Sequence, residues 1–228
     1  MESLRVLIEA LIAEGVLERE VTETSRKIVD ALKLKLSKTG GFVRQFKLKF
    51  PVPQSVDARS IEVDVRRGMA EDVPSVGGDS RYNKDYPERN IVRIWIEVPK
   101  GWSDFSFMLS QLSIVIPDLK DMLRHEFEHF TQTPKEWAQM RKQNLKTPKG
   151  VENYFMDPRE VKAHVMGMYK LAKTSKKDLG RVFLDRNKEV YGFMRSAGAD
   201  GLRSSAVARS VLRAWREYAR GRLPSARL

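Results

Sequence analysis

The sequence predicts an α+β fold in which a small, twisted and mainly antiparallel sheet packs against helices. Two periodicities carry this prediction. Three stretches between residues 42 and 98 alternate apolar and polar side chains, which is the pattern of strands with one buried face. On both sides of this region apolar residues recur every three or four positions, as they do in amphipathic helices. The sheet is therefore expected near the middle of the chain, with extra helices at the N- and C-terminal ends.

Length and composition predict one central domain with an addition at each end. The chain has 228 residues, of which 41% are hydrophobic and 32% charged, and this is enough apolar material for one good core. We expect an N-terminal helical segment at residues 1–40, a central domain at 41–173 and a basic C-terminal helical extension at 174–228.

The same composition indicates a compartment. The chain contains no cysteine, which excludes disulfides and thiolate metal ligands and fits a reducing environment. Glu9 and Glu14 interrupt the apolar residues at the N-terminus and no small-residue cleavage site follows, so no secretory signal peptide is predicted. The longest uncharged run, from Phe105 to Pro117, is too short to span a bilayer. A cytoplasmic protein without a transmembrane segment is therefore expected.

The elements of the N-terminal half follow from these patterns and their breaks. A first helix is expected to stop at Gly15, and a second to run from about Val21 to Leu36. An antiparallel meander is the simplest arrangement of the three strands, with the polar segment Pro74 to Arg89 as a loop. The expected strands are residues 42–50, 61–66 and 92–98.

Helices are predicted for most of the rest of the chain. Ser103 is a good N-cap for a helix through Leu112, with an extended segment at Ile114-Val-Ile116 as the alternative for the residues that follow. Pro117 fits the first turn of the next helix, which ends near Thr133. The basic segment from Lys135 to Gly150 is expected to be a solvated loop, with a lid over a cleft as the alternative. Three further helical patterns cover about 158–173, 179–193 and 204–220.

One motif on the second of these helices indicates a chemistry. His125, Glu126 and His129 form a His-Glu-x-x-His pattern. Histidines four residues apart lie on one face of a helix, so both imidazoles can reach one metal ion. Glu126 flanks that face and can accept a proton from a metal-bound water. Histidine and carboxylate ligands of this kind favour Zn²⁺.

A second group of residues offers the third ligand that a catalytic zinc site needs. Asp157 is predicted to cap a helix that begins at Pro158, which places Glu160 in the first turn and His164 one turn later on the same face. Glu160 is the expected third ligand. Its alternative role is a favourable interaction with the helix dipole. His164 has three alternatives: third ligand, hydrogen-bond partner of an outer atom of the site, or ordinary core histidine.

The two groups together resemble the zincin metallopeptidases. The His125-Glu126-x-x-His129 motif, followed by a helix that carries Glu160 after the lead-in Tyr154-x-x-Asp157-Pro158, is similar to the branch with glutamate as third ligand, the gluzincins, which includes small phage-encoded and bacterial members. The resemblance covers roughly residues 90 to 170. The chain departs from the metzincin extension at Gln132 and Lys135, and it has His164 where thermolysin-like sequences place an aspartate.

The resemblance implies a zincin-like sheet packed on the two ligand-bearing helices, and a zinc-dependent peptidase that acts on a polypeptide. Glu126 would be the general base. Tyr154, Tyr169 and His164 are the candidates for stabilising the oxyanion. The strand at 92–98 would offer an edge to which an extended substrate could add. If the protein is phage-encoded, it is expected in the host cytoplasm or the virion.

The C-terminal charge supports a different function. The formal net charge is +12, and the residues from Arg203 onward carry seven arginines against the single acid Glu217. A basic amphipathic helix of this kind can bind an anionic partner, which is nucleic acid, an acidic protein surface or an anionic membrane. The alternative is a packed helix whose arginines are only solvated. The alternative function is therefore a non-enzymatic phage-particle or nucleic-acid-associated protein, in which the zincin-like domain is structural and the C-terminal helix binds.

Overall fold

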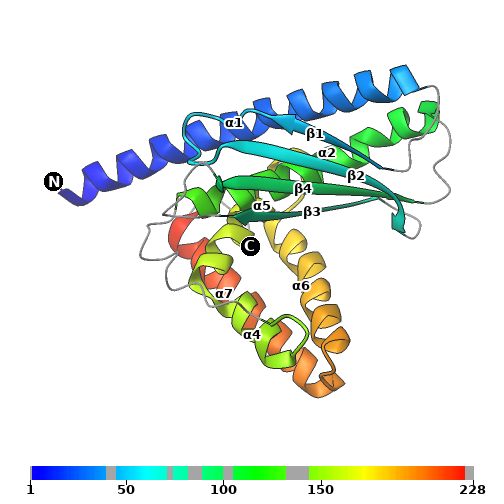
Figure 1. Ribbon diagram of the computed structural model, residues 1–228. Helices are drawn as coiled ribbons and strands as arrows, with labels where there is room; N and C mark the ends of the chain where they lie inside the picture. The colour runs from blue at the N-terminus through cyan, green and yellow to red at the C-terminus, as the bar shows by residue number, and fades with distance from the viewer. Residues whose placement is uncertain are drawn as a thin grey trace. The chain divides into compact units, whose positions relative to one another are not determined.

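The computed structural model describes residues 2–39, 45–70, 74–81, 89–99, 105–131 and 144–223. Side chains are described for residues 16–35, 45–66, 74–81, 89–99, 112–131 and 144–223. The chain divides into two compact units, Met1–Thr131 and Gln132–Leu228. The first holds a mixed sheet with two long helices, and the second holds four helices in its described part (Figure 1). The fold is thus α+β, as predicted.

The sheet of the first unit has four strands in the order β1-β2-β4-β3. Its strands are β1 (Gln45–Phe50), β2 (Ser60–Ala70), β3 (Ser75–Arg81) and β4 (Ile91–Pro99). β1 pairs antiparallel with β2, and β3 pairs antiparallel with β4, but β2 and β4 are parallel. The predicted antiparallel meander is therefore wrong for the pairing of β2 with β4, which is parallel. The chain passes through β3 between these two strands, and β3 lies at the edge of the sheet.

β3 occupies part of the segment that the sequence predicts as a loop. Its sequence, Ser-Val-Gly-Gly-Asp-Ser-Arg, has few of the residues that favour strands. Its two glycines are required by close packing instead. A Cβ at Gly77 would lie 2.3 Å from Nε1 of Trp95, and a Cβ at Gly78 would lie 2.9 Å from Sδ of Met122. Backbone pairing with β4 thus outweighs the low strand propensity of these residues.

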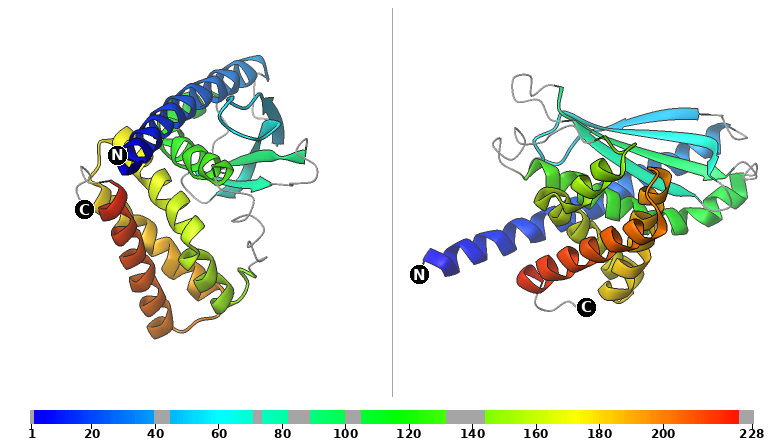
Figure 2. Two further views of the ribbon diagram at one scale, coloured as in Figure 1. Left: turned by 90° about the vertical axis from the view of Figure 1, so that its left-hand side faces the viewer. Right: turned by 90° about the horizontal axis from the view of Figure 1, so that it is seen from below.

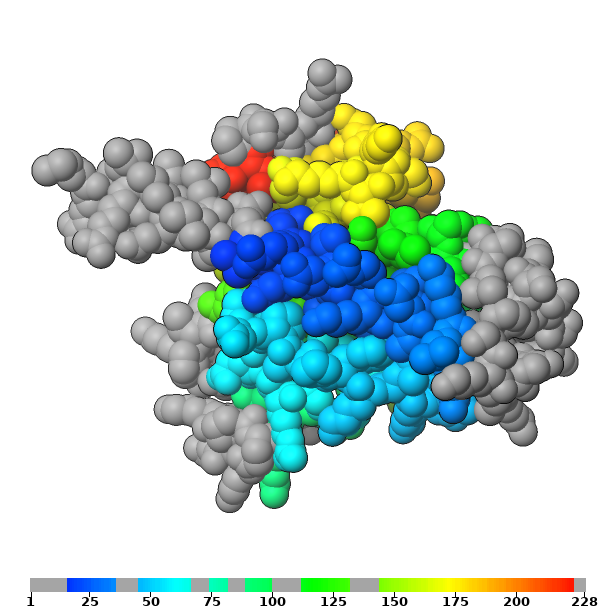
Figure 3. Space-filling model, turned by 90° about the horizontal axis from the view of Figure 1, so that it is seen from above, coloured from blue at the N-terminus to red at the C-terminus, as the bar shows by residue number. Residues whose placement is uncertain are grey.

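The alternation of β4 and its neighbours buries one face of the sheet, as predicted. The helices α1 (Glu2–Thr39) and α2 (Phe105–Phe130) pack on each other, and their apolar residues join this face in one core (Figures 1 and 2). In Figure 3 the described side chains of α1 (blue) lie beside those of β1 and β2 (cyan). The centre of the core contains Val21, Ile28, Ile61, Val63, Val92, Leu119, Leu123 and Phe127.

Two predicted helix boundaries in this unit are wrong. α1 runs through Gly15, because an interior glycine costs about 1 kcal/mol relative to alanine and this is too little to end a helix with good helix formers on both sides. α2 runs through Pro117, which lies inside the helix and not in its first turn. Buried apolar residues from Leu112 to Phe130 are spaced by three or four, so packing holds one continuous helix across the proline. The expected cap Ser103 and the expected end at Thr133 lie outside the described residues.

The second unit is helical in its described part. Its elements are α4 (Pro148–Met156), α5 (Pro158–Ser175), α6 (Leu179–Ser196) and α7 (Gly201–Arg222). Asp157, Asp178 and Asp200 cap the last three through their carboxylates, which accept hydrogen bonds from backbone N–H groups of the first turn. The predicted Asp157-Pro158 helix start is confirmed. Most of the predicted connector, residues 135–143, lies outside the described residues, and its last residues belong to α4.

The core of this unit lies where α5, α6 and α7 meet (Figure 2). Trp215 and Phe183 are its largest fully buried side chains, with ring centroids 6.0 Å apart. None of the helices in the described part of the chain has an apolar window long enough to cross a bilayer.

Candidate metal centre

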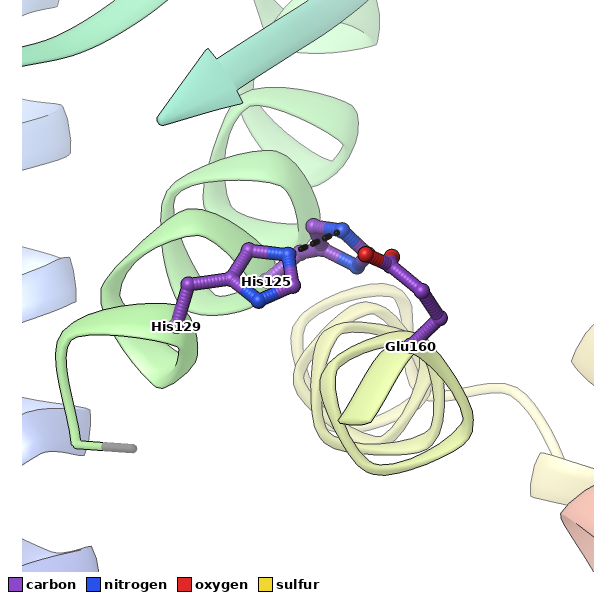
Figure 4. A group of neighbouring side chains, drawn as sticks. All are labelled: His125, His129 and Glu160. Atoms are coloured by element: carbon purple, nitrogen blue, oxygen red, sulfur yellow. Dashed lines mark hydrogen bonds between the residues drawn. The ribbon is translucent and has the colours of Figure 1, made fainter. Parts of the chain in front are cut away.

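The two histidines of the motif lie on the last turns of α2. One face of this helix packs in the sheet core through Leu119, Leu123 and Phe127. The two histidines lie on another face of the same helix, which is also buried. Both are buried, with relative exposures of 6% and 4%. Their Nε2 atoms lie 3.2 Å apart and the rings meet edge to face (Figure 4).

This separation fits two ligands of one metal ion. Zinc binds imidazole nitrogen at 2.0–2.1 Å with tetrahedral angles, so two nitrogens on one ion stand about 3.3 Å apart. The observed distance of 3.2 Å between the Nε2 atoms is close to that value. Histidines four residues apart on a helix do not have to converge in this way, because their side chains have several rotamers.

Glu126 lies beside the histidine pair. Its exposure is 3%, and its Oε1 is 4.0 Å from Nε2 of His125. The edge strand β3 closely approaches it, because a Cβ at Gly78 would be 3.0 Å from its Cγ. Gly78 therefore leaves room for the carboxylate next to the sheet edge. Glu126 thus lies beside the two histidines, and the helical spacing does not reveal the strand next to it.

A buried ionic group links α2 to α1 next to the motif, because Arg124 directly precedes His125 and Glu128 directly precedes His129. Arg124 is 2% exposed, and its guanidinium forms an ion pair with Glu128 and lies 3.4 Å from the Glu18 carboxylate of α1. The Thr131 hydroxyl donates to Glu128 at 2.9 Å. The sequence does not predict this group, because nothing in it marks Glu18 as the partner of a residue 106 positions away. The group fixes the rotation of the motif helix.

Glu160 lies in the first turn of α5, three residues after the N-cap Asp157. Its exposure is 4%. Burial raises the pKa of its carboxyl from 4.5 to about 7, while a hydrogen bond with Tyr154 of α4 acts in the opposite direction. A buried carboxylate with a raised pKa gains stability from a nearby positive charge. The position thus has the electrostatics of a cation ligand.

His125, His129 and Glu160 form a group that can hold a metal ion. One ligand atom of each lies within 4.8 Å of the others, and all three residues are buried (Figure 4). His164 is not in this group. Its ring stacks on Phe155 at 5.3 Å and lies 5.8 Å from Tyr154 and 5.9 Å from Trp215, measured between ring centroids.

Comparison with known proteins gives no family. No family model, curated protein or solved structure matches the chain. Function is therefore inferred from the site itself.

The arrangement has the parts of a hydrolytic metal site. Three nitrogen and oxygen ligands, two histidines and one glutamate, are the set that catalytic zinc ions use when a fourth position is left for water. A fourth buried residue, Glu126, is next to the ligands without belonging to the group. The roles of Tyr154, His164 and Tyr169 in stabilising an oxyanion stay predictions.

Proposed function

We propose that the protein is a zinc-dependent metallopeptidase, with His125, His129 and Glu160 as metal ligands and Glu126 as general base. The observation that carries this proposal is the 3.2 Å separation of the two Nε2 atoms beside a buried carboxylate. The donor set fits zinc, since it contains no thiolate and includes two imidazoles. Tyr154 supports the set by its hydrogen bond with Glu160, which orients the carboxylate.

The chain's own residues supply the proton transfers. Zinc, when bound, polarises the substrate carbonyl and lowers the pKa of a coordinated water. The Glu126 carboxylate accepts the proton of the attacking water and then donates it to the leaving amine, so the C–N bond breaks as the amine becomes neutral. Burial of Glu126 favours this transfer, because water does not compete for the proton.

The outer edge of β3 is the proposed place for the substrate backbone. The predicted edge strand, 92–98, is wrong in this respect, because β4 pairs with β2 on one side and with β3 on the other. β3 is the terminal strand of the sheet on this side within the described residues, and Gly78 brings it next to Glu126. An extended peptide that added to β3 would pass the general base.

A peptide library read by mass spectrometry tests the proposed activity. The zinc-loaded protein is expected to cleave a mixed-sequence library. Glu126→Gln keeps the shape of the side chain but not its basicity, and is expected to lose at least a thousandfold in rate while retaining zinc. Glu62→Gln, a substitution on the half-buried outer face of the sheet near Arg93, is the matched control and should leave the rate unchanged.

Two results would count against the proposal. Cleavage by Glu126→Gln at the rate of the wild type would indicate a contaminating peptidase. Bound zinc without cleavage of any library member would favour the alternative in which the metal centre is structural and the protein is not an enzyme.

A further inference from the structure

The second unit carries the whole net charge of the protein. Residues 132–228 contain 22 Lys and Arg against 9 Asp and Glu, whereas residues 1–131 contain 20 against 21. A surplus of 13 positive charges in fewer than 100 residues attracts anions over a distance of about 10 Å at moderate salt. The charge alone does not specify a site, but its arrangement on α7 does.

Four arginines of α7 form a single row. Arg209, Arg213, Arg216 and Arg220 are spaced by four, three and four residues. At 100° per residue all four point into an arc of about 60°, and the row is about 16 Å long. We call these four residues the arginine row. Arg209, Arg213 and Arg220 are exposed, and Arg216 is half-buried.

The arginine row differs from the basic residues of α6 in its partners. On α6, Arg181 and Lys188 pair with Asp185, and Arg186 pairs with Glu189. Among the described residues, no member of the arginine row has an ion pair or hydrogen bond. Like charges at this spacing destabilise a helix, and Glu217 is the single acid of α7 against its six arginines. The row is therefore suited to an external anion.

The opposite face of α7 argues against a membrane surface as the anionic partner. Val207, Val211, Trp215 and Ala219 are at most 7% exposed, and they pack in the core with α5 and α6. α7 thus packs on both α5 and α6. A helix that inserts into a membrane surface must offer an apolar face to the lipid. The apolar face of α7 is already used.

We propose that the arginine row binds the phosphate backbone of nucleic acid, independently of base sequence. All six basic residues of α7 are arginine, whose planar fork binds phosphate through two hydrogen bonds. Each DNA strand presents a phosphate about every 3.4 Å of rise, so a row of about 16 Å faces on the order of five phosphates. A nucleic acid offers such a line of anions whatever its sequence, whereas an acidic protein would need carboxylates at matching intervals.

Salt dependence of binding tests this proposal. The probes are fluorescein-labelled 20-nucleotide DNA, single- and double-stranded, titrated with the full-length protein at several KCl concentrations. Four phosphate contacts predict that the logarithm of affinity falls with the logarithm of salt with a slope of about −3.6 for the duplex. The double variant R209Q/R213Q should reduce this slope by about 2 and weaken binding at least tenfold at 100 mM salt.

The control removes the same charge from paired residues. R181Q/K188Q takes two positive charges from α6, where both have an acidic partner, and is expected to weaken binding less than threefold. Equal losses in the two double variants would overturn the arginine row in favour of diffuse attraction. Absence of DNA binding at 50 mM salt, or tighter binding to poly-glutamate or to phosphatidylserine vesicles than to DNA, would also overturn it. None of these results depends on metal or on peptidase activity.

Discussion

The two units treat their charged residues in opposite ways. The first is almost neutral and has a largely buried ionic group, Arg124 and Glu128 of the motif helix with Glu18 of α1. The second is strongly basic and displays four arginines in a row without partners among its described residues. A buried arginine with two acids fixes the structure, because removing a partner leaves a charge in the core. An exposed arginine without acids contributes little to stability and is available to a ligand.

Substituting Arg124 should give the largest change in stability. Arg124→Ala leaves the buried Glu128 and the half-buried Glu18 without their cation and is expected to lower the free energy of unfolding by roughly 3–5 kcal/mol. The matched variant in the second unit, Arg213→Ala, is expected to change it by less than about 0.5 kcal/mol. Chemical denaturation followed by circular dichroism measures both. Similar values for the two variants would break the contrast between the units.

The pH dependence of stability should report on Glu160. Its folded pKa of about 7 exceeds the unfolded value of 4.5, so the folded state binds the proton more tightly. In the metal-free protein the contribution of Glu160 to the free energy of unfolding should therefore be fully present below pH 4.5. This contribution should fall by about 3 kcal/mol as the pH rises to 7. Glu160→Gln cannot ionise, and its unfolding free energy should not show this loss. Parallel pH profiles of the two proteins would contradict the raised pKa.

Saturating zinc should remove most of this loss above pH 7. The ion offsets the buried negative charge of Glu160 and binds only the folded state. His164→Ala, which changes the aromatic cluster of the same helix, should leave the zinc effect intact.

The glycines of β3 should give a smaller effect. Gly77→Ala places a Cβ 2.3 Å from the Trp95 indole, and displacement of that ring is expected to cost about 1–3 kcal/mol. Gly78→Ala meets the more flexible Met122 and also Cγ of Glu126, so the loss of peptidase rate should exceed the loss of stability. Rates and unfolding free energies of the two variants, compared side by side, separate these effects. A full rate in Gly78→Ala would argue against β3 as a neighbour of the reacting groups.

Local patterns in the sequence are sufficient where local physics decides the structure. The alternation of β4, the Asp157-Pro158 helix start and the shared helix face of His125 and His129 all follow from period and capping. The same capping pattern correctly predicts Glu160 in the first turn of its helix. The α+β class follows from the same periods.

Long-range packing decides the features that the sequence does not reveal. The parallel pairing of β2 and β4 depends on which strands meet and not on their composition. β3 is a strand because its glycines admit Trp95 and α2, although its residues favour turns. Pro117 stays within α2 because residues on both sides of it are buried in one core. The arginine row is visible in the sequence, but the acid partners of α6 that set it apart are seen only in the structure.

Metal content tests the central claim most directly. The purified protein, dialysed against zinc and then against buffer, should contain about one zinc per chain by elemental analysis, in keeping with the single group His125, His129 and Glu160 among the described residues. His129→Ala and Glu160→Ala should lose the metal, and His164→Ala should keep it. Absence of metal in the wild type, or its full retention by both ligand variants, would contradict the proposed metal centre.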